Sequence, residues 1–127
     1  MIADSSVWID FARGIATAQV AALERTIADR SAMTTDIVRL EVLSGETQVA
    51  RLGAALDGCE QVMQLPRVDV EDAAHIYRVC RRAGETIRSL NDCLIAAIAI
   101  RNDVAVLHRD RDYQAIARHT RLRAVTT

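Results

Sequence analysis

The alternation of short apolar runs with helix-like stretches is the feature that most constrains how this chain folds. Apolar runs of three or four residues recur along the 127 residues, and segments with helically spaced apolar residues separate them. Strands separated by helices favour an α/β domain with a mainly parallel central sheet. The predicted strands are Met1–Ala3, Ala32–Thr34, Val62–Leu65, Val104–Leu107 and Leu122–Val125.

The segments between these strands predict helices. Apolar spacing marks their interiors, and Gly14, Gly45, Gly58 and Gly84 mark the ends of several. We expect Ser89–Arg101 to be the most apolar helix, and we expect the helix before it to open at Asp69 or Glu71. The other predicted helices are Val7–Phe11, Thr17–Asp29, Ile37–Leu43, Val49–Leu56 and Tyr113–Ala117.

Length and composition predict one domain over residues 1–127, since half of the residues are hydrophobic and no linker is apparent. The sequence holds no long uncharged apolar stretch and no basic leader, so we expect a soluble, cytoplasmic protein with no membrane association. The three cysteines, Cys59, Cys80 and Cys93, form no C-x-x-C pair and are expected to be reduced core residues.

The charge of the chain is distributed unevenly. A formal net charge of −1 argues against a nucleic-acid binder, but residues 1–66 hold five arginines against nine acids, and residues 67–127 hold eleven against eight. All basic residues are arginines, which suits phosphate contacts and equally fits a compositional bias. Four of them could form a phosphate-binding patch or a solvated helix face: Arg78, Arg81, Arg82 and Arg88.

Several carboxylates fall where active sites of open α/β sheets lie, beyond the carboxyl ends of the strands. Asp4 follows the first strand, and Asp110 and Asp112 follow the strand that ends at Leu107. Asp92 lies in the first turn of the most apolar helix, and Glu41 shares a helix face with apolar neighbours.

Each acid also has a structural interpretation. Ser89 and Asp92 fit a capping box, Asp110 fits a helix N-cap, and Asp4 fits a turn. Glu41 fits such an interpretation less well, because glutamate is seldom buried without a partner. As a set, these acids would repel one another unless a cation neutralised them, and Mg²⁺ or Mn²⁺ are the natural counter-ions for carboxylate oxygens.

Four segments resemble the motifs of VapC-type PIN-domain toxins. Met1–Ile9 is similar to the D-T-S-x-W start of that family, and Arg39–Gly45 resembles its E-x-L-x-G helix motif. Ser89–Ala97 is similar to its third motif and His108–Tyr113 to its fourth, T-x-D-x-D-F. The four segments occur in the family's order and span the chain from Asp4 to Tyr113.

This resemblance implies a PIN-like three-layer α/β/α domain with a mainly parallel central sheet flanked by helices. It also implies an Mg²⁺- or Mn²⁺-dependent endoribonuclease that cleaves tRNA or rRNA, forms a homodimer and is inhibited by a VapB-type antitoxin whose C-terminal segment covers the active site. The residues it implies for metal ligation or water activation are Asp4, Glu41, Asp92 and Asp110, with Asp112 assisting and the Ser6 hydroxyl nearby.

Three positions depart from the family pattern. Ser5 and His108 each replace a threonine, and Tyr113 replaces a phenylalanine. These departures leave open whether Asp110 or Asp112 faces the metal.

Other functions are weaker matches to the sequence. A catalytically silent domain that only binds a partner protein is the main alternative. A metal-independent ribonuclease using His108 and His119 as base and acid is a further one. His108–Asp110 also matches part of a kinase catalytic loop, but the chain has no glycine-rich loop and is far too short.

Overall fold

The central feature of the fold is a five-stranded sheet with the strand order β3-β2-β1-β4-β5, seen in a computed structural model that describes residues 1–45 and 48–127. Every pairing is parallel, which confirms the predicted mainly parallel α/β arrangement. In chain order the elements are β1 (Ile2–Ala3), α1 (Ser5–Ala12), α2 (Ala18–Ala28), β2 (Met33–Thr34), α3 (Asp36–Leu43), α4 (Val49–Asp57), β3 (Glu60–Gln61), α5 (Pro66–Arg82), α6 (Leu90–Arg101), β4 (Val106–Leu107), α7 (Arg111–His119) and β5 (Ala124–Val125).

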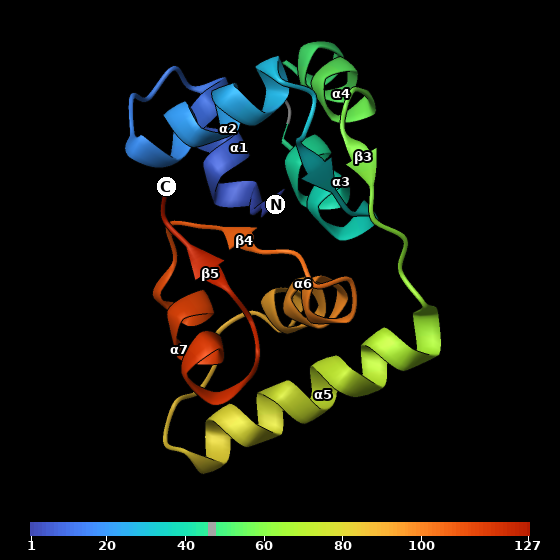
Figure 1. Ribbon diagram of the computed structural model, residues 1–127, viewed down its shortest axis with the longest axis vertical. Helices are drawn as coiled ribbons and strands as arrows, with labels where there is room; N and C mark the ends of the chain where they lie inside the picture. Colours follow the sequence, from blue (N-terminus) through green and yellow to red (C-terminus); the bar gives the residue numbers. More distant parts are fainter. Residues whose placement is uncertain (46–47) are drawn as a thin grey trace.

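Helices flank the sheet on both sides, as the predicted three-layer architecture requires. Figure 1 shows α1 and α2 on one side and α5, α6 and α7 on the other, with α3 and α4 beside the β3 end. The helix α5 packs most extensively against α6, and α3 contacts both α1 and α6. None of the helices in the described part of the chain has the length and apolar character needed to cross a bilayer.

The helix α6 lies at the centre of the core. Its residues from Ile95 to Ala99 are all buried, so it has no solvent-facing stripe along this part. The small side chains of Ala96, Ala97 and Ala99 let neighbouring elements approach closely. The packing of α6 against α5, α7 and α3 fixes its first turn, where Asp92 lies.

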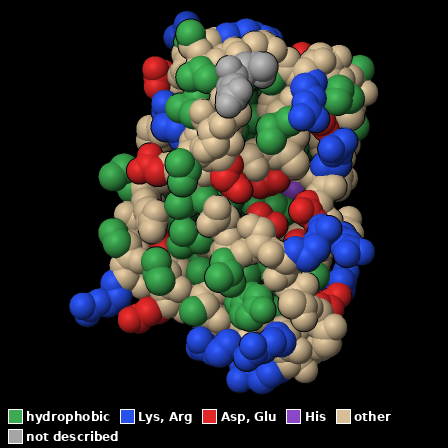
Figure 2. All heavy atoms as spheres, turned by 180° about the vertical axis from the view of Figure 1, so that it is seen from behind, with side chains coloured by type: hydrophobic (Ala, Val, Ile, Leu, Met, Phe, Trp, Pro, Cys, Tyr) green, Lys and Arg blue, Asp and Glu red, His purple; other side chains and the backbone are tan. Residues whose placement is uncertain are grey.

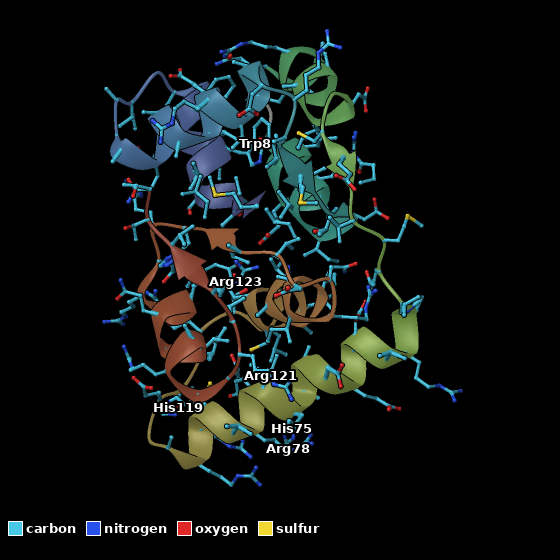
Figure 3. All side chains as sticks on the ribbon, in the orientation of Figure 1. Trp8, His75, Arg78, His119, Arg121 and Arg123 are labelled. Atoms are coloured by element: carbon cyan, nitrogen blue, oxygen red, sulfur yellow. The ribbon has the colours of Figure 1, made fainter. Side chains whose placement is uncertain are left out.

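Trp8 and the cysteines belong to the core, and the prediction that the cysteines are core residues is confirmed. Trp8 is fully buried on α1 and meets Phe11 edge to face, with ring centroids 5.9 Å apart (Figure 3). Cys59, Cys80 and Cys93 are buried free thiols.

The predicted strand at Val62–Leu65 is wrong in position, because β3 is Glu60–Gln61. The Val62 side chain is buried, and its N–H still donates to the Thr34 carbonyl at 2.8 Å, but the strand itself ends at Gln61. Met63 and Leu65 are exposed. The apolar run therefore marks the exit from an edge strand, and its last residues leave the sheet.

The helix α5 begins at Pro66, three residues before the earlier of the two predicted starts. Proline suits the first position of a helix, because its φ is already helical and its missing N–H is not needed there. Asp69 supports this start as well, since its Oδ2 accepts the Leu65 N–H at 2.6 Å and its carboxylate pairs with Arg101.

Candidate active site

The candidate site lies at the point where the strand order reverses, between the neighbouring strands β1 and β4. The chain leaves β1 toward β2 on one side and β4 lies on the other, so the loops after β1 and β4 diverge and leave a crevice. Ala3 is in register with Leu107, and the Asp4 N–H donates to the Leu107 carbonyl at 2.9 Å. The acids that follow these strands are therefore brought to one place.

Asp4 is the N-cap of α1 and both of its carboxylate oxygens are engaged. Oδ2 accepts hydrogen bonds from the Ser6 N–H at 3.2 Å and the Ser6 hydroxyl at 2.7 Å. Oδ1 accepts the hydroxyl of Tyr113, which is 2.9 Å away. The turn interpretation of Asp4 is therefore replaced by a helix cap, and the same carboxylate is held at the carboxyl end of β1.

Tyr113 is a site residue that the sequence interpretation noted only as a departure from the family pattern. Its buried hydroxyl contacts Asp4 and also lies 3.3 Å from Asp92 Oδ1. Burial, followed by the nearby carboxylates of Asp4 and Asp92, raises the pKa of the Tyr113 hydroxyl well above its ordinary value. The hydroxyl therefore keeps its proton and links the first and third motifs.

Asp92 lies in the first turn of α6 and is 6% exposed. Burial raises its pKa to about 7, and the carboxylates of Asp4, Asp110, Glu41 and Asp112 act in the same direction. The Ser89 side chain forms no capping hydrogen bond with any described residue, so the predicted capping box is wrong. Asp92 is therefore a buried carboxyl group with other carboxylates close around it.

Asp110 and Asp112 meet Asp92 on the side of the site formed by α7. Asp110 is the N-cap of α7 and its Oδ1 accepts the Asp112 N–H at 3.0 Å. One carboxylate oxygen from each of Asp92, Asp110 and Asp112 lies within 4.8 Å of the others. The geometry thus brings both Asp110 and Asp112 to the site.

Glu41 reaches the same region from α3. Its Oε1 is buried with no hydrogen-bond partner in the described part of the chain. Burial raises the pKa of Glu41, the Asp4 carboxylate raises it further, and polar contacts with Asn91 and Ser5 oppose the shift. A buried carboxylate oxygen without a donor is costly, which favours a cation as its partner.

The donor set fits a hard divalent cation. Asp92, Asp110 and Asp112 converge with carboxylate oxygens, which Mg²⁺ and Mn²⁺ prefer, and Asp4 and Glu41 lie near enough to raise the pKa of Asp92. The Cys93 thiol is buried, which raises its pKa to about 12. Figure 2 shows acidic side chains crossing the middle of one face, with arginines beside them.

A hollow of about 500 Å³ lies next to the acids. Three arginines line it together with Ser6 and Asp110: Arg88, Arg109 and Arg111. Of the predicted patch, only Arg88 reaches this hollow. Arg78, Arg81 and Arg82 lie on the last turns of α5, where Arg81 stacks 5.6 Å from the Tyr77 ring centroid and Arg78 points outward (Figure 3).

His108 and His119 lie at opposite ends of α7. His108 is buried before the N-cap, and its Nδ1 accepts the Asp110 N–H at 3.1 Å. Burial lowers the pKa of His108. His119 is the last residue of α7 and pairs with Glu85 at 2.5 Å (Figure 3). A nine-residue helix separates them, about 13 Å of rise, so they cannot act as a base and acid pair.

Comparisons with known proteins agree with this geometry. A model of the PIN domain family matches residues 1–119. The sequence is 38% identical to VapC ribonuclease Mb1587 of Mycobacterium bovis and to Ribonuclease VapC11 of Mycobacterium tuberculosis, over 99% of this chain and 98% of each relative. The chain belongs to the PIN-domain family and, within it, to the VapC ribonucleases.

The fold is also similar to that of a solved structure. The crystal structure of VapBC2 from Rickettsia felis bound to a DNA fragment from their promoter matches with a TM-score of 0.71. The match covers 98% of this chain and 96% of that chain at 15% identity, so it speaks for the fold. The predicted PIN-like α/β/α architecture is confirmed.

Proposed function

We propose that this chain is an Mg²⁺- or Mn²⁺-dependent endoribonuclease and the toxin of a toxin-antitoxin pair. The observation that carries the proposal is the convergence of carboxylate oxygens from Asp92, Asp110 and Asp112 within 4.8 Å, at the switch point of a parallel sheet. The 38% identity to VapC ribonucleases along the whole chain supports RNA as the substrate, with tRNA or rRNA as the class.

The residues proposed to hold the metal are Asp4, Glu41, Asp92 and Asp110, with Asp112 beside them. When bound, the divalent ion supplies stabilisation for the charge that develops on the phosphate and lowers the pKa of water for attack on phosphorus. The chain's own residues prepare the site. Ser6 and Tyr113 orient Asp4, and Asp92 releases its proton so that its carboxylate can act as a ligand.

Glu41 is the proposed orienting group for the attacking water. Its partly buried carboxylate has one oxygen that no described residue donates to, and its raised pKa makes it a better proton acceptor than an exposed glutamate. The arginines of the hollow are placed to contact neighbouring phosphates of the RNA strand.

An antitoxin of the VapB type is the proposed protein partner, with a homodimer as the assembly and residues 1–127 as one domain in the cytoplasm. Apolar side chains of α5 and α6 support a protein contact: Val70, Ala73, Leu90 and Leu94 line a hollow together with Asn91, which precedes Asp92 in the sequence. Leu90 and Leu40 are more than 60% exposed, which is unusual for leucine unless a partner covers it.

The testing experiment is cleavage of RNA in chelator and after addition of Mg²⁺ or Mn²⁺, followed by analysis of the product ends. We expect no cleavage in chelator, restored cleavage with metal, and a downstream fragment with a 5′-phosphate that can be ligated directly, because water from outside the RNA is the nucleophile. Asp92→Asn should remove the activity, whereas Asp72→Asn, the same change at an exposed position of α5, should retain it.

Two outcomes would contradict the proposal. Cleavage in excess chelator that leaves 5′-hydroxyl ends would point to attack by the RNA's own 2′-hydroxyl. A protein that binds the metal without any turnover would instead support the catalytically silent regulator.

A further inference from the structure

Arg88 contacts both acids of the fourth motif from outside that motif. It lies between α5 and α6, and its Nη2 donates to Asp110 Oδ1 at 2.8 Å while its Nε donates to Asp112 Oδ2 at 3.3 Å. Its backbone N–H also donates to Asp112 Oδ2, at 3.1 Å. One residue thus holds two carboxylates that precede and begin α7.

These contacts use one oxygen of each carboxylate. In the part of the chain that the structure describes, the hydrogen bonds to Asp110 go to Oδ1 and those to Asp112 go to Oδ2. Asp110 Oδ2 and Asp112 Oδ1 accept none from any described residue. The arrangement leaves one oxygen of each acid available to a ligand.

The segment that carries Arg88 is anchored on both sides. Ile87 is buried in the core, and Glu85 pairs with Arg118 and His119 at the far end of α7. Arg88 is therefore presented to the acids by a segment tied to the same helix, α7, that its guanidinium contacts.

Two carboxylates so close together repel each other, and their side chains would turn apart toward solvent without a donor between them. The planar guanidinium presents N–H groups in a fixed fork, which a lysine ammonium lacks. Hydrogen-bond partners of metal-binding carboxylates fix the orientation of the ligands, and their loss weakens metal binding.

We propose that Arg88 is a positioning residue that holds Asp110 and Asp112 so that their free oxygens converge with Asp92 on a divalent cation. The inference rests on the metal site of the proposed function and adds to it a residue that does not itself bind the ion. Arg88 acts through the fork geometry of its guanidinium, and a positive charge alone is not sufficient to hold both carboxylates in this orientation.

The test is Mn²⁺ binding by calorimetry to the wild-type protein, Arg88→Lys and Arg109→Lys. Both substitutions keep the charge, and both arginines line the same hollow, but Arg109 pairs with Asp10, at 3.0 Å, and not with the clustered acids. We expect Arg88→Lys to weaken Mn²⁺ binding roughly tenfold. Arg109→Lys should bind Mn²⁺ like the wild type, and the urea midpoint of Arg88→Lys in chelator should be unchanged.

The outcomes separate this inference from the function it rests on. If the wild-type protein takes up no Mn²⁺, the metal site and the positioning role are both overturned. If wild type and Arg88→Lys bind Mn²⁺ equally, only the positioning role is overturned. A lower urea midpoint of Arg88→Lys with unchanged Mn²⁺ affinity would assign Arg88 to stability and would also overturn it.

Discussion

The hydroxyl of Tyr113 donates to Asp4 Oδ1 at 2.9 Å and so joins the first strand to the last helix across 109 residues of sequence. The same hydroxyl oxygen lies 3.3 Å from Asp92. Since a hydroxyl has one proton to donate, it serves one carboxylate at a time, and the second contact is favourable when Asp92 carries a proton. Tyr113 thus holds the buried Asp4 in place and contacts Asp92 with the same hydroxyl oxygen.

Tyr113→Phe removes this donor and leaves Asp4 Oδ1 buried without it. In chelator, we expect the free energy of unfolding to fall by about 1–2 kcal/mol, the usual cost of an unsatisfied buried acceptor. Saturating Mn²⁺ should narrow the difference from wild type, because the released oxygen becomes available to the ion. Urea unfolding in both conditions measures this, with Tyr77→Phe on α5 as the matched control. An equal loss in chelator and in Mn²⁺ would show that Asp4 Oδ1 does not reach the metal.

The raised pKa of Asp92 predicts a dependence of stability on pH in chelator. Its pKa is about 7 in the folded protein against an ordinary value of 3.8, so the folded chain keeps a proton that the unfolded chain has lost. This contribution to stability is fully present below about pH 3.8 and is lost as the pH rises through about 7. Unfolding measured from pH 4.5 to 8 should show a decline that Asp92→Asn reduces.

Metal binding should follow the opposite trend. A carboxylate must be deprotonated to bind the ion, so Mn²⁺ affinity should rise with pH up to about 7 and then level off. Calorimetric titrations at several pH values measure this trend. An affinity that is constant between pH 5.5 and 8 would exclude Asp92 from the ligand set.

Much of the fold could be predicted from the sequence, because local patterns determine it. The capping residues Thr17 and Thr35 lie where the helical spacing begins, and α6 is identified by apolar residues on every face. The edge strand β3 was misplaced, since an apolar run does not show where backbone pairing ends. The start of α5 was misplaced because Asp69 receives the Leu65 N–H and the Arg101 guanidinium, and the second of these comes from another helix.

The sequence named the acids that the structure brings together, but it did not show that Tyr113 and Arg88 contact them. Strand ends and motif order identify Asp4, Asp92 and Asp110, because these features can be recognised within short stretches of consecutive residues. The contacts of Tyr113 with Asp4 and of Arg88 with Asp112 join segments far apart in the chain, so they depend on how the helices pack. The same limit explains why the predicted arginine patch is not found as one surface: of its four arginines, only Arg88 lies at the site.

Glu41→Gln tests whether the half-buried acid of α3 serves the chemistry or the fold. We expect cleavage to fall by roughly a hundredfold or more, since a glutamine cannot accept a proton from water. In chelator the melting temperature should stay equal or rise, because one repelling charge leaves the cluster. Glu24→Gln, at an exposed position of α2, is the control and should change neither quantity. A lower melting temperature of Glu41→Gln in chelator would indicate a structural role instead.

Arg111 and Arg81 distinguish the hollow beside the acids from the far end of α5 as the place where RNA phosphates bind. Arg111 lines the hollow together with Ser6, whereas Arg81 lies in the last turn of α5 over the ring of Tyr77. Each phosphate that a basic residue neutralises adds about 0.7 to the slope of log affinity against log salt for single-stranded RNA.

We therefore expect Arg111→Gln to lower this slope by roughly 0.7 and to weaken binding at low salt, while Arg81→Gln leaves both unchanged. The measurement uses the Asp92→Asn protein in chelator, so that the RNA is bound without being cut. Both substitutions remove one exposed positive charge, which makes the total charge the same in the two variants. An equal decrease of the slope in both variants would mean that RNA binding depends only on the net charge of residues 67–127. A decrease confined to Arg81→Gln would instead place the bound RNA along α5.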